Sequence, residues 1–496
     1  MIRHLRLPLT GLLAALLLFA PLPFGGATPW AASALQALAL AALVLAALTL
    51  DRPARLRPAA LPAAALAAIA TLGAVQSLPW PEGLVERLSP RHAELQRQAA
   101  ALPGVEGGGA ARLTLAPAAS AGAARSWAAA AAVLLAGAAA GLSRSGRRAL
   151  AAAVLAGALF QVFFGAQQWF ANSLTLWGVE IPRSPRLHGT FINPNHLALY
   201  LEMALAVAFA ALWWGVRRAQ KEPHMDRRLL LVAVPGLLWL TLFTGLAFTG
   251  SRGGLLAAVA GVAVQGLLVA AARRDWRAAA LGCGAAAAGV AVVAAVGLRE
   301  GLGRILATTA GDTSWLARWW EYGAVIDLWK RFPVTGSGLG TFRDAFPLVQ
   351  PAGLQGTWWH AHSDLLELLA TTGVVGLLLL AAGAVLPVRR LLGVLRGHGR
   401  SEDRGAALAA LGALAAVGLH EALDFGLTLP GNSLTLAVLI GAALAVEPSP
   451  AGGSKQAHGA GSHAPSAEAA EVEDVQPRSQ GDGKAERTRR KRRKRA

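Results

Sequence analysis

The stretch "WWHAHSDLLELLATTGVVG" (358–376) places two histidines directly before a long apolar segment. Ionisable groups beside hydrocarbon are costly unless they are paired or used, so His360 and His362 are candidates for chemistry. Ser363 can cap the incoming helix, and Asp364 suits its first turn. The positive end of that helix disfavours imidazolium, which predicts a neutral His362 that can accept a proton.

Two arginines in other segments are candidates for binding an anion. Arg252 stands in the short turn "TGSRGG", where small neighbours let an anion come close to the backbone. Arg186 stands three residues before Gly189 in "RLHGTFINPNH", and Arg183 competes with it three residues earlier. Each residue also has an explanation that involves no chemistry. Arg252 could extend its side chain to the lipid head groups, and His362 could be only hydrogen-bonded at the membrane interface.

The elements that must position these groups are transmembrane helices. The chain has 496 residues, 54% hydrophobic and 15% charged, and apolar runs of about 20 residues recur along it. These features predict an all-α polytopic membrane protein with about twelve spans. The predicted spans are residues 7–24, 30–50, 58–78, 126–142, 148–168, 195–215, 229–249, 254–272, 278–298, 363–386, 405–423 and 433–447.

Short basic segments occur in every second connection between these spans. By the positive-inside rule those connections are cytoplasmic, and so are both termini. The remaining connections face the other side of the membrane. The predicted regions are N-terminal helices in 1–150, helices carrying both arginine sites in 151–298, a large outer loop in 299–362, C-terminal helices in 363–447 and a disordered basic cytoplasmic tail in 448–496.

Composition excludes several classes of function. The net charge of +18 comes largely from the cytoplasmic loops and the tail, so it requires no nucleic-acid partner. Cys283 is the single cysteine, which excludes intrachain disulfides and thiolate metal clusters. The chain contains no phosphate-binding P-loop and no Asp-x-Asp pair, so we expect no cofactor and no metal. A metal site on His360 and His362 is the weak alternative, because no third ligand is evident.

The long outer loop carries two further patterns. "SWLARWWEYGAVIDLWKRF" is rich in tryptophan, which is typical of a helix on the membrane interface that acts as an anchor or as a platform for sugars. "TGSGLGTF" lacks the dinucleotide-binding pattern and predicts a turn. In the following span, Gly373 lies about three helical turns after His362, and Gly376 lies one turn deeper. Such small residues permit close approach by a neighbouring helix.

Several of these segments together resemble the O-antigen ligase and polysaccharide polymerase superfamily. "HSDLLELLATTGVVG" fits the superfamily pattern of His, then Asn, Ser or Gln, nine residues, Gly, two residues and Gly. Other superfamily segments are similar to "RLHGTFINPNHLALYL", "TGSRGG", "FPVTGSGLGTFRDAFP" and "HEALDFGLTLPGN". The resemblance runs from about residue 155 to residue 446.

The resemblance implies a C-type glycosyltransferase architecture in a bacterial inner membrane, with the active site at the periplasmic face. Such enzymes move a glycan from an undecaprenyl pyrophosphate carrier to an acceptor hydroxyl, such as that of the lipid A core, with inversion and without metal. His362 then corresponds to the general base, and Arg186 and Arg252 correspond to the pyrophosphate-binding arginines. The secondary candidates for positioning are Arg183, Glu202, Arg318, Arg343, His360 and Asp424.

The chemistry of the residues agrees with this implication. Pyrophosphate is a good leaving group, so the reaction needs fixed cations and a base rather than a strong acid. An O-antigen or exopolysaccharide polymerase and a protein O-oligosaccharyltransferase would carry the same motifs. A solute transporter is the alternative of another class, but the strongly polar groups gather at one membrane face rather than at the midplane.

Overall fold

The structure is a computed structural model. It describes residues 5–50, 53–103, 110–181, 184–273, 276–277, 280, 282–284, 287, 313–397 and 399–447. The described residues belong to one compact unit, Met1–Ala451. Residues 448–496, predicted to be a disordered tail, lie outside the described residues.

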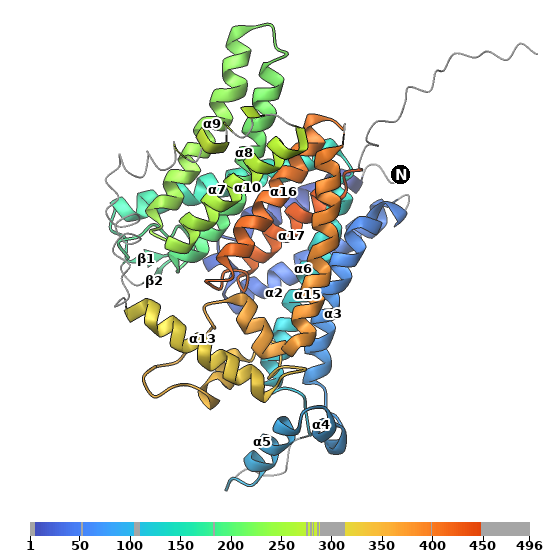
Figure 1. Cartoon of the computed structure of the whole chain (residues 1–496), viewed down its shortest axis with the longest axis vertical. Helices are drawn as coiled ribbons and strands as arrows, with labels where there is room; N and C mark the ends of the chain where they lie inside the picture. The colour runs from blue at the N-terminus through green and yellow to red at the C-terminus, as the bar shows by residue number, and fades with distance from the viewer. Residues whose placement is uncertain are drawn as a thin grey trace, which may run out of the picture. The chain divides into compact units, whose positions relative to one another are not determined.

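The described elements are helices, with one small hairpin of two-residue strands (Figure 1). Their order is α1 (Arg6–Phe19), η2 (Phe24–Gly26), α2 (Pro29–Thr49), η3 (Pro53–Leu56), α3 (Arg57–Ser77), α4 (Glu82–Leu88), α5 (Pro90–Ala100), α6 (Pro117–Gly141), α7 (Arg144–Phe170), β1 (Thr175–Leu176), β2 (Val179–Glu180), α8 (Pro194–Ala219), α9 (Met225–Phe248), α10 (Arg252–Arg273), α13 (Thr313–Arg331), α14 (Phe342–Ala345), η4 (Phe346–Leu348), α15 (Asp364–Arg396), α16 (Ser401–His420) and α17 (Pro430–Leu444).

The predicted class, an all-α multi-pass membrane protein, is confirmed. Among the described residues, eight helical segments are long and apolar enough to cross a membrane: α2, η3 with α3, α6, α7, α8, α9, α10 and α15. The helices α1 and α17 are apolar but shorter. Helix α16 covers most of the predicted span 405–423. Most of the predicted span 278–298 lies outside the described residues.

Two spans are longer than their apolar runs predict. Helix α6 begins at Pro117 rather than at Ser126, because the alanine-rich sequence before Ser126 favours helix and proline suits a first helical position. Helix α15 continues to Arg396, beyond the predicted end at residue 386. Helix α7 crosses residue 150, where the sequence suggested a boundary between regions.

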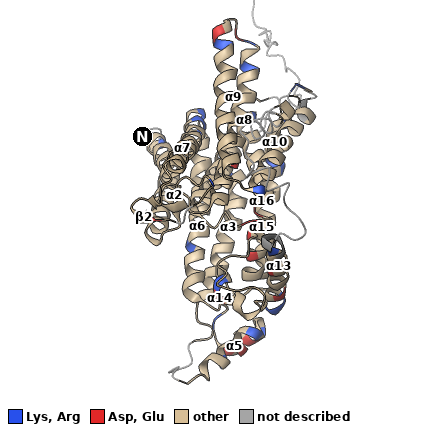
Figure 2. Cartoon of the chain, turned by 90° about the vertical axis from the view of Figure 1, so that its left-hand side faces the viewer, with Lys and Arg blue, Asp and Glu red and all other residues tan. Residues whose placement is uncertain are grey.

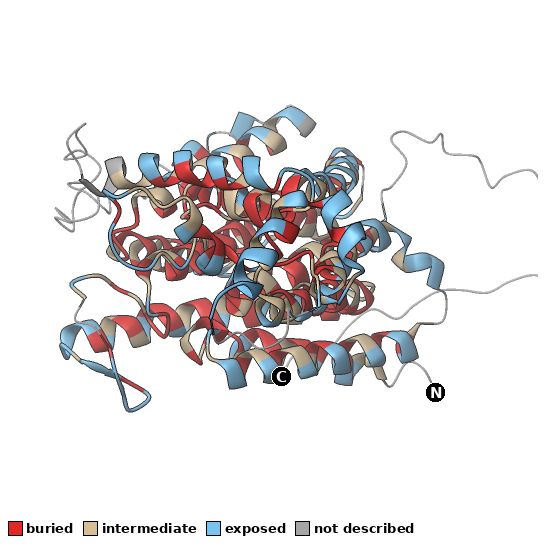
Figure 3. Cartoon of the chain, turned by 90° about the horizontal axis from the view of Figure 1, so that it is seen from below, coloured by how far each residue is buried: buried red, intermediate tan, exposed pale blue. Residues whose placement is uncertain are grey.

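Helix α8 occupies the centre of the helical bundle. It packs against α9, α16, α10 and α7. Of the residues in its most apolar stretch, 89% are buried. A helix that is hydrophobic on every side is suited to such a position. The buried faces of the surrounding helices turn inward, and their exposed faces turn outward (Figure 3).

Helix α13 lies across the beginning of α15 (Figure 1). Val325 and Leu328 of α13, together with Phe332 directly after it, form a separate small core with Phe342 and Phe346. Acidic and basic residues occur together around α13 and α5, and the far ends of α8 and α9 carry basic residues beside a few acidic ones (Figure 2). This core fixes one face of α13 against the site described below.

Helix α15 is interrupted at Gly373. This glycine has φ 65° and ψ −164°, a conformation that is accessible essentially only to glycine. The backbone of the segment 333–338 fills the break, because the amides of Val374 and Ser337 donate to the carbonyls of Pro333 and Ala370. The prediction that a neighbouring helix approaches at Gly373 was therefore wrong: the approaching element is a loop.

Replacing Gly373 with alanine is expected to lower the apparent melting temperature of the purified protein by about 5 °C or more. An added Cβ would clash with the carbonyl oxygen of Val334, and the backbone conformation would be strained. Gly393 lies in the same helix with no atom within 4 Å of an added Cβ. Gly393→Ala should leave the melting temperature unchanged or slightly raised, since alanine favours helix. Equal melting temperatures for the two variants would contradict this account.

Candidate active site

His362 is paired with a carboxylate from a distant segment. Its Nδ1 lies 2.9 Å from Oε2 and 3.2 Å from Oε1 of Glu321, which is on α13. The Glu321 side chain is fully buried, whereas 29% of the His362 side chain is exposed. When Nδ1–H donates to the carboxylate, Nε2 carries the lone pair and can accept a proton.

The backbone also fixes His362. Its φ of 43° is unusual for a residue other than glycine. The hydroxyl of Tyr322 donates to the His362 carbonyl at 2.9 Å. The next residue, Ser363, is the N-cap of α15 and accepts from the amide of Leu366, so the helix start confirms the predicted cap. His362 therefore stands just outside the helix. Tyr322 holds its carbonyl, and the helix cap fixes the residue that follows it.

Sequence reasoning missed Glu321. Burial raises the pKa of this carboxyl, and the hydrogen bond to His362 acts in the opposite direction. A signal for it was present: Glu321 lies one helical turn before Val325 and two before Leu328, on the buried face of α13. A charged residue within such an apolar face needs a partner, and His362 is that partner.

Phe425 joins three histidines and was also missed. Its ring stacks on His360 with centroids 4.5 Å apart, and it meets His362 and His196 edge-on at 5.1 and 4.9 Å. Trp358 contacts the His362 ring at 5.4 Å. The segment after α16 therefore contacts both the start of α15 and the start of α8.

Arg186 contacts the turn that carries the second predicted arginine. Its Nε donates to the Thr249 carbonyl at 2.6 Å, and one of its Nη atoms donates to Oδ1 of Asn195 at 2.6 Å. Arg252 is the first residue of α10 and follows that turn directly. The two arginines, which are 66 positions apart in the sequence, thus belong to one structural neighbourhood.

Asp424 connects this neighbourhood to α13. Its Oδ2 accepts from the Asn195 side chain at 2.7 Å and lies 3.6 Å from a guanidinium nitrogen of Arg318. Arg318 also donates to the Leu423 carbonyl at 2.8 Å. Contacts therefore run from Arg186 through Asn195 and Asp424 to Arg318, which is one helical turn before Glu321.

Glu202 pairs with His420 next to the turn that precedes α10. Glu202 Oε1 and His420 Nδ1 are 2.5 Å apart, and both side chains are almost completely buried. A Cβ on Gly254 would lie 3.1 Å from the same Glu202 oxygen. The pair therefore supports the turn at the start of α10 rather than lying in an open site.

The other predicted residues lie toward the outer surface. His360 pairs with Glu367 at 3.1 Å. Burial lowers the pKa of His360, but the hydrogen bond and the charges of Glu367 and the neighbouring carboxylates together raise it above its usual value. The Arg343 guanidinium lies 3.8 Å from the centre of the Trp359 ring, an exposed cation–π contact. Arg183 lies outside the described residues.

Comparison with protein families agrees with the resemblance seen in the sequence. Residues 236–381 match the family model described as O-antigen ligase. This match makes the segment similar to O-antigen ligases. That segment includes Arg252, Glu321 and His362, whereas Arg186 and Asp424 lie outside it. No curated protein matches the chain. The chain is therefore a multi-pass helical protein that is similar to O-antigen ligases over residues 236–381.

Proposed function

We propose that this protein transfers a glycan from an undecaprenyl pyrophosphate carrier to a hydroxyl of the lipid A core, with inversion and without metal. The observation that carries the proposal is the pairing of Glu321 with His362 at 2.9 Å. Through Phe425 and Asp424, this pair shares a contact network with Arg186. A base and a cationic site are the two requirements of a reaction in which pyrophosphate leaves.

The reaction can be written from these groups. The acceptor oxygen attacks the anomeric carbon from the side opposite the pyrophosphate, so the configuration inverts. The bond between that carbon and the pyrophosphate oxygen breaks, and its electron pair leaves on the pyrophosphate. Nε2 of His362 takes the acceptor proton, and Glu321 stabilises the resulting imidazolium. Arg186 and Arg252 stabilise the charge on the leaving pyrophosphate.

The proposal places this site at the periplasmic face of the bacterial inner membrane, with both termini in the cytoplasm. The alternation of basic connections along the sequence supports this orientation. The far ends of α8 and α9 are basic, and these helices run from there to the arginine region at the other end (Figure 2). Donor, acceptor and enzyme would thus meet at the boundary between the hydrocarbon and the periplasm.

Analysis of the glycans in a deletion strain tests the proposed reaction. Lipid-linked glycan and finished surface polymer are measured in the wild type, in the deletion strain and after complementation. The expected result is full-length lipid-linked chains together with bare lipid A core in the deletion strain. Single unjoined repeats would instead indicate a polymerase, and loss of glycan from proteins would indicate an O-oligosaccharyltransferase. Unchanged glycans in the deletion strain would contradict a glycosyltransferase function.

A further inference from the structure

A cavity of about 430 Å³ lies between α3, α6, α15 and α17. Its walls are almost entirely apolar and include Leu66, Trp127, Leu368, Leu380 and Leu436. Three of its four wall helices are candidate membrane spans, and α17 is the shorter apolar helix. An apolar space among such helices suits hydrocarbon rather than water.

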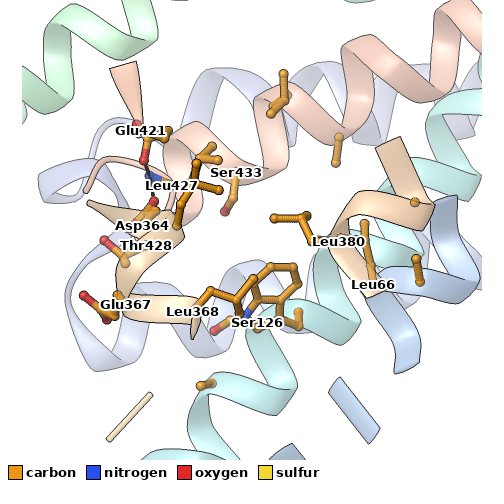
Figure 4. A pocket seen from close by; sticks show the side chains of 18 of the residues that line it. Leu66, Ser126, Asp364, Glu367, Leu368, Leu380, Glu421, Leu427, Thr428 and Ser433 are labelled. Atoms are coloured by element: carbon orange, nitrogen blue, oxygen red, sulfur yellow. Dashed lines mark hydrogen bonds between the residues drawn. The ribbon is translucent and has the colours of Figure 1, made fainter. Parts of the chain in front are cut away.

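The cavity has one polar end. Asp364, Glu367, Glu421 and Thr428 gather there, whereas Leu66 and Leu380 lie at the opposite end (Figure 4). The polar end is next to the catalytic candidate in the chain, because Asp364 is two residues after His362. On α15 alone, the lining residues run from Asp364 to Pro387, roughly 30 Å of helix. The space is therefore long, and one of its ends lies beside the proposed base.

The polar end is built to accept hydrogen bonds. Asp364 Oδ2 and Glu421 Oε2 both accept from the amide of Leu427, at 3.0 and 3.1 Å. Glu421 is buried, its Oε2 also accepts from the amide of Gly426 at 2.9 Å, and its carboxyl group shares a hydrogen bond with Asp364. Glu367 is held by His360 and by the amide of Ala361. Sugar hydroxyls are donors that match such carboxylates.

Charge distinguishes between the two lipid substrates of the proposed reaction. Asp364 and Glu421 hydrogen-bond each other, so one of these two carboxyl groups carries the shared proton. The remaining carboxylate and Glu367 would repel a pyrophosphate, and among the described lining residues at the polar end only His360 can be cationic. Arg186, Arg252 and Arg318 do not line the cavity. The donor head group therefore fits the arginine neighbourhood, and the carboxylate end is left for the acceptor.

We propose that this cavity binds one hydrocarbon chain of an amphiphilic glycosyl acceptor, whose sugar hydroxyls contact Glu367 and whose reacting hydroxyl reaches His362. The inference rests on the proposed function and adds to it the place at which a hydrocarbon chain of the acceptor binds. A chainless oligosaccharide or a protein acceptor would leave the apolar part of the cavity unused.

The test narrows the cavity and compares two acceptors. Ala384 lines the cavity, whereas Ala382, on the same helix and also exposed, does not. Wild-type protein, Ala384→Trp, the milder Ala384→Leu and the control Ala382→Trp are purified in lipid nanodiscs. Each is assayed with a fixed polyprenyl pyrophosphate-linked donor and with one oligosaccharide acceptor, either bare or carrying a single saturated alkyl chain.

The wild type is expected to have a lower KM for the alkylated acceptor than for the bare one. Ala384→Trp should raise the KM for the alkylated acceptor about tenfold and leave the KM for the donor unchanged. Ala384→Leu should act in the same direction, and Ala382→Trp should behave as wild type. A raised donor KM would assign the cavity to the carrier and overturn the proposal, as would unchanged KM values, which indicate a bilayer lipid. Absence of any wild-type transfer would instead contradict the proposed function.

Discussion

Replacing His362 with glutamine is expected to slow glycan transfer by about 10²- to 10⁴-fold, the usual contribution of a general base. Glutamine has a similar length and can still hydrogen-bond Glu321, but it cannot take the acceptor proton. The rate is measured with purified enzyme and lipid-linked donor. His224 is an exposed histidine at the N-cap of α9, far along the chain from the site, and His224→Gln serves as the matched control.

Two measurements separate a base from a structural residue. Added imidazole should partly restore transfer by His362→Ala, because it can enter the space that the side chain leaves and accept the proton. The apparent melting temperature of His362→Gln should stay close to that of the wild type. If a folded His362→Gln protein transfers glycan at the wild-type rate, the assignment of the base is wrong.

The rate of glycan transfer also tests the role of Glu321. Glu321→Gln removes the charge that stabilises the imidazolium, so transfer should fall by at least about tenfold. In the His362→Gln background, the Glu321 substitution should cost almost nothing more, because the carboxylate acts through the histidine. A full additional loss in the double variant would mean that Glu321 acts independently of His362.

The membrane fold was predictable because its signals are local. The length of each apolar run and the placement of basic residues are read along the chain, and the described spans follow them. The break at Gly373 was not predictable in this way. It depends on the segment 333–338, about 40 positions earlier, and on hydrogen bonds that only the folded chain forms.

The residues of the candidate site also fall into those that the sequence reveals and those that only the folded chain reveals. His362, Arg186 and Arg252 stood out because a charge or an imidazole near hydrocarbon is unusual within its own segment. Phe425 has no such local signal, and the signal of Glu321, a charge on an apolar helix face, does not identify its partner. The importance of both residues comes from contacts with His362, which is 41 positions from Glu321 and 63 positions from Phe425. The helix-dipole argument for His362 was correspondingly incomplete, because it contained no carboxylate.

Replacing Arg252 or Arg186 with glutamine is expected to lower kcat by about 10²- to 10³-fold, a loss comparable to that of an oxyanion-stabilising donor. The missing guanidinium can no longer stabilise the charge that develops on the leaving pyrophosphate. Lysine should restore only part of the rate, because it lacks the planar fork that matches phosphate oxygens. Arg331→Gln, at the exposed end of α13, is the matched control and should leave kcat unchanged.

Inhibition by inorganic pyrophosphate separates charge from structure at Arg186. This side chain already holds the Thr249 carbonyl and Asn195, so its loss could act by displacing the turn before α10. Glutamine retains an N–H donor for the carbonyl but carries no charge. If the charge matters, Arg186→Gln keeps its melting temperature while pyrophosphate inhibits it more weakly than it inhibits the wild type. A lower melting temperature with unchanged inhibition would make Arg186 a support of the turn, and Arg252 alone would then be left to stabilise the leaving group.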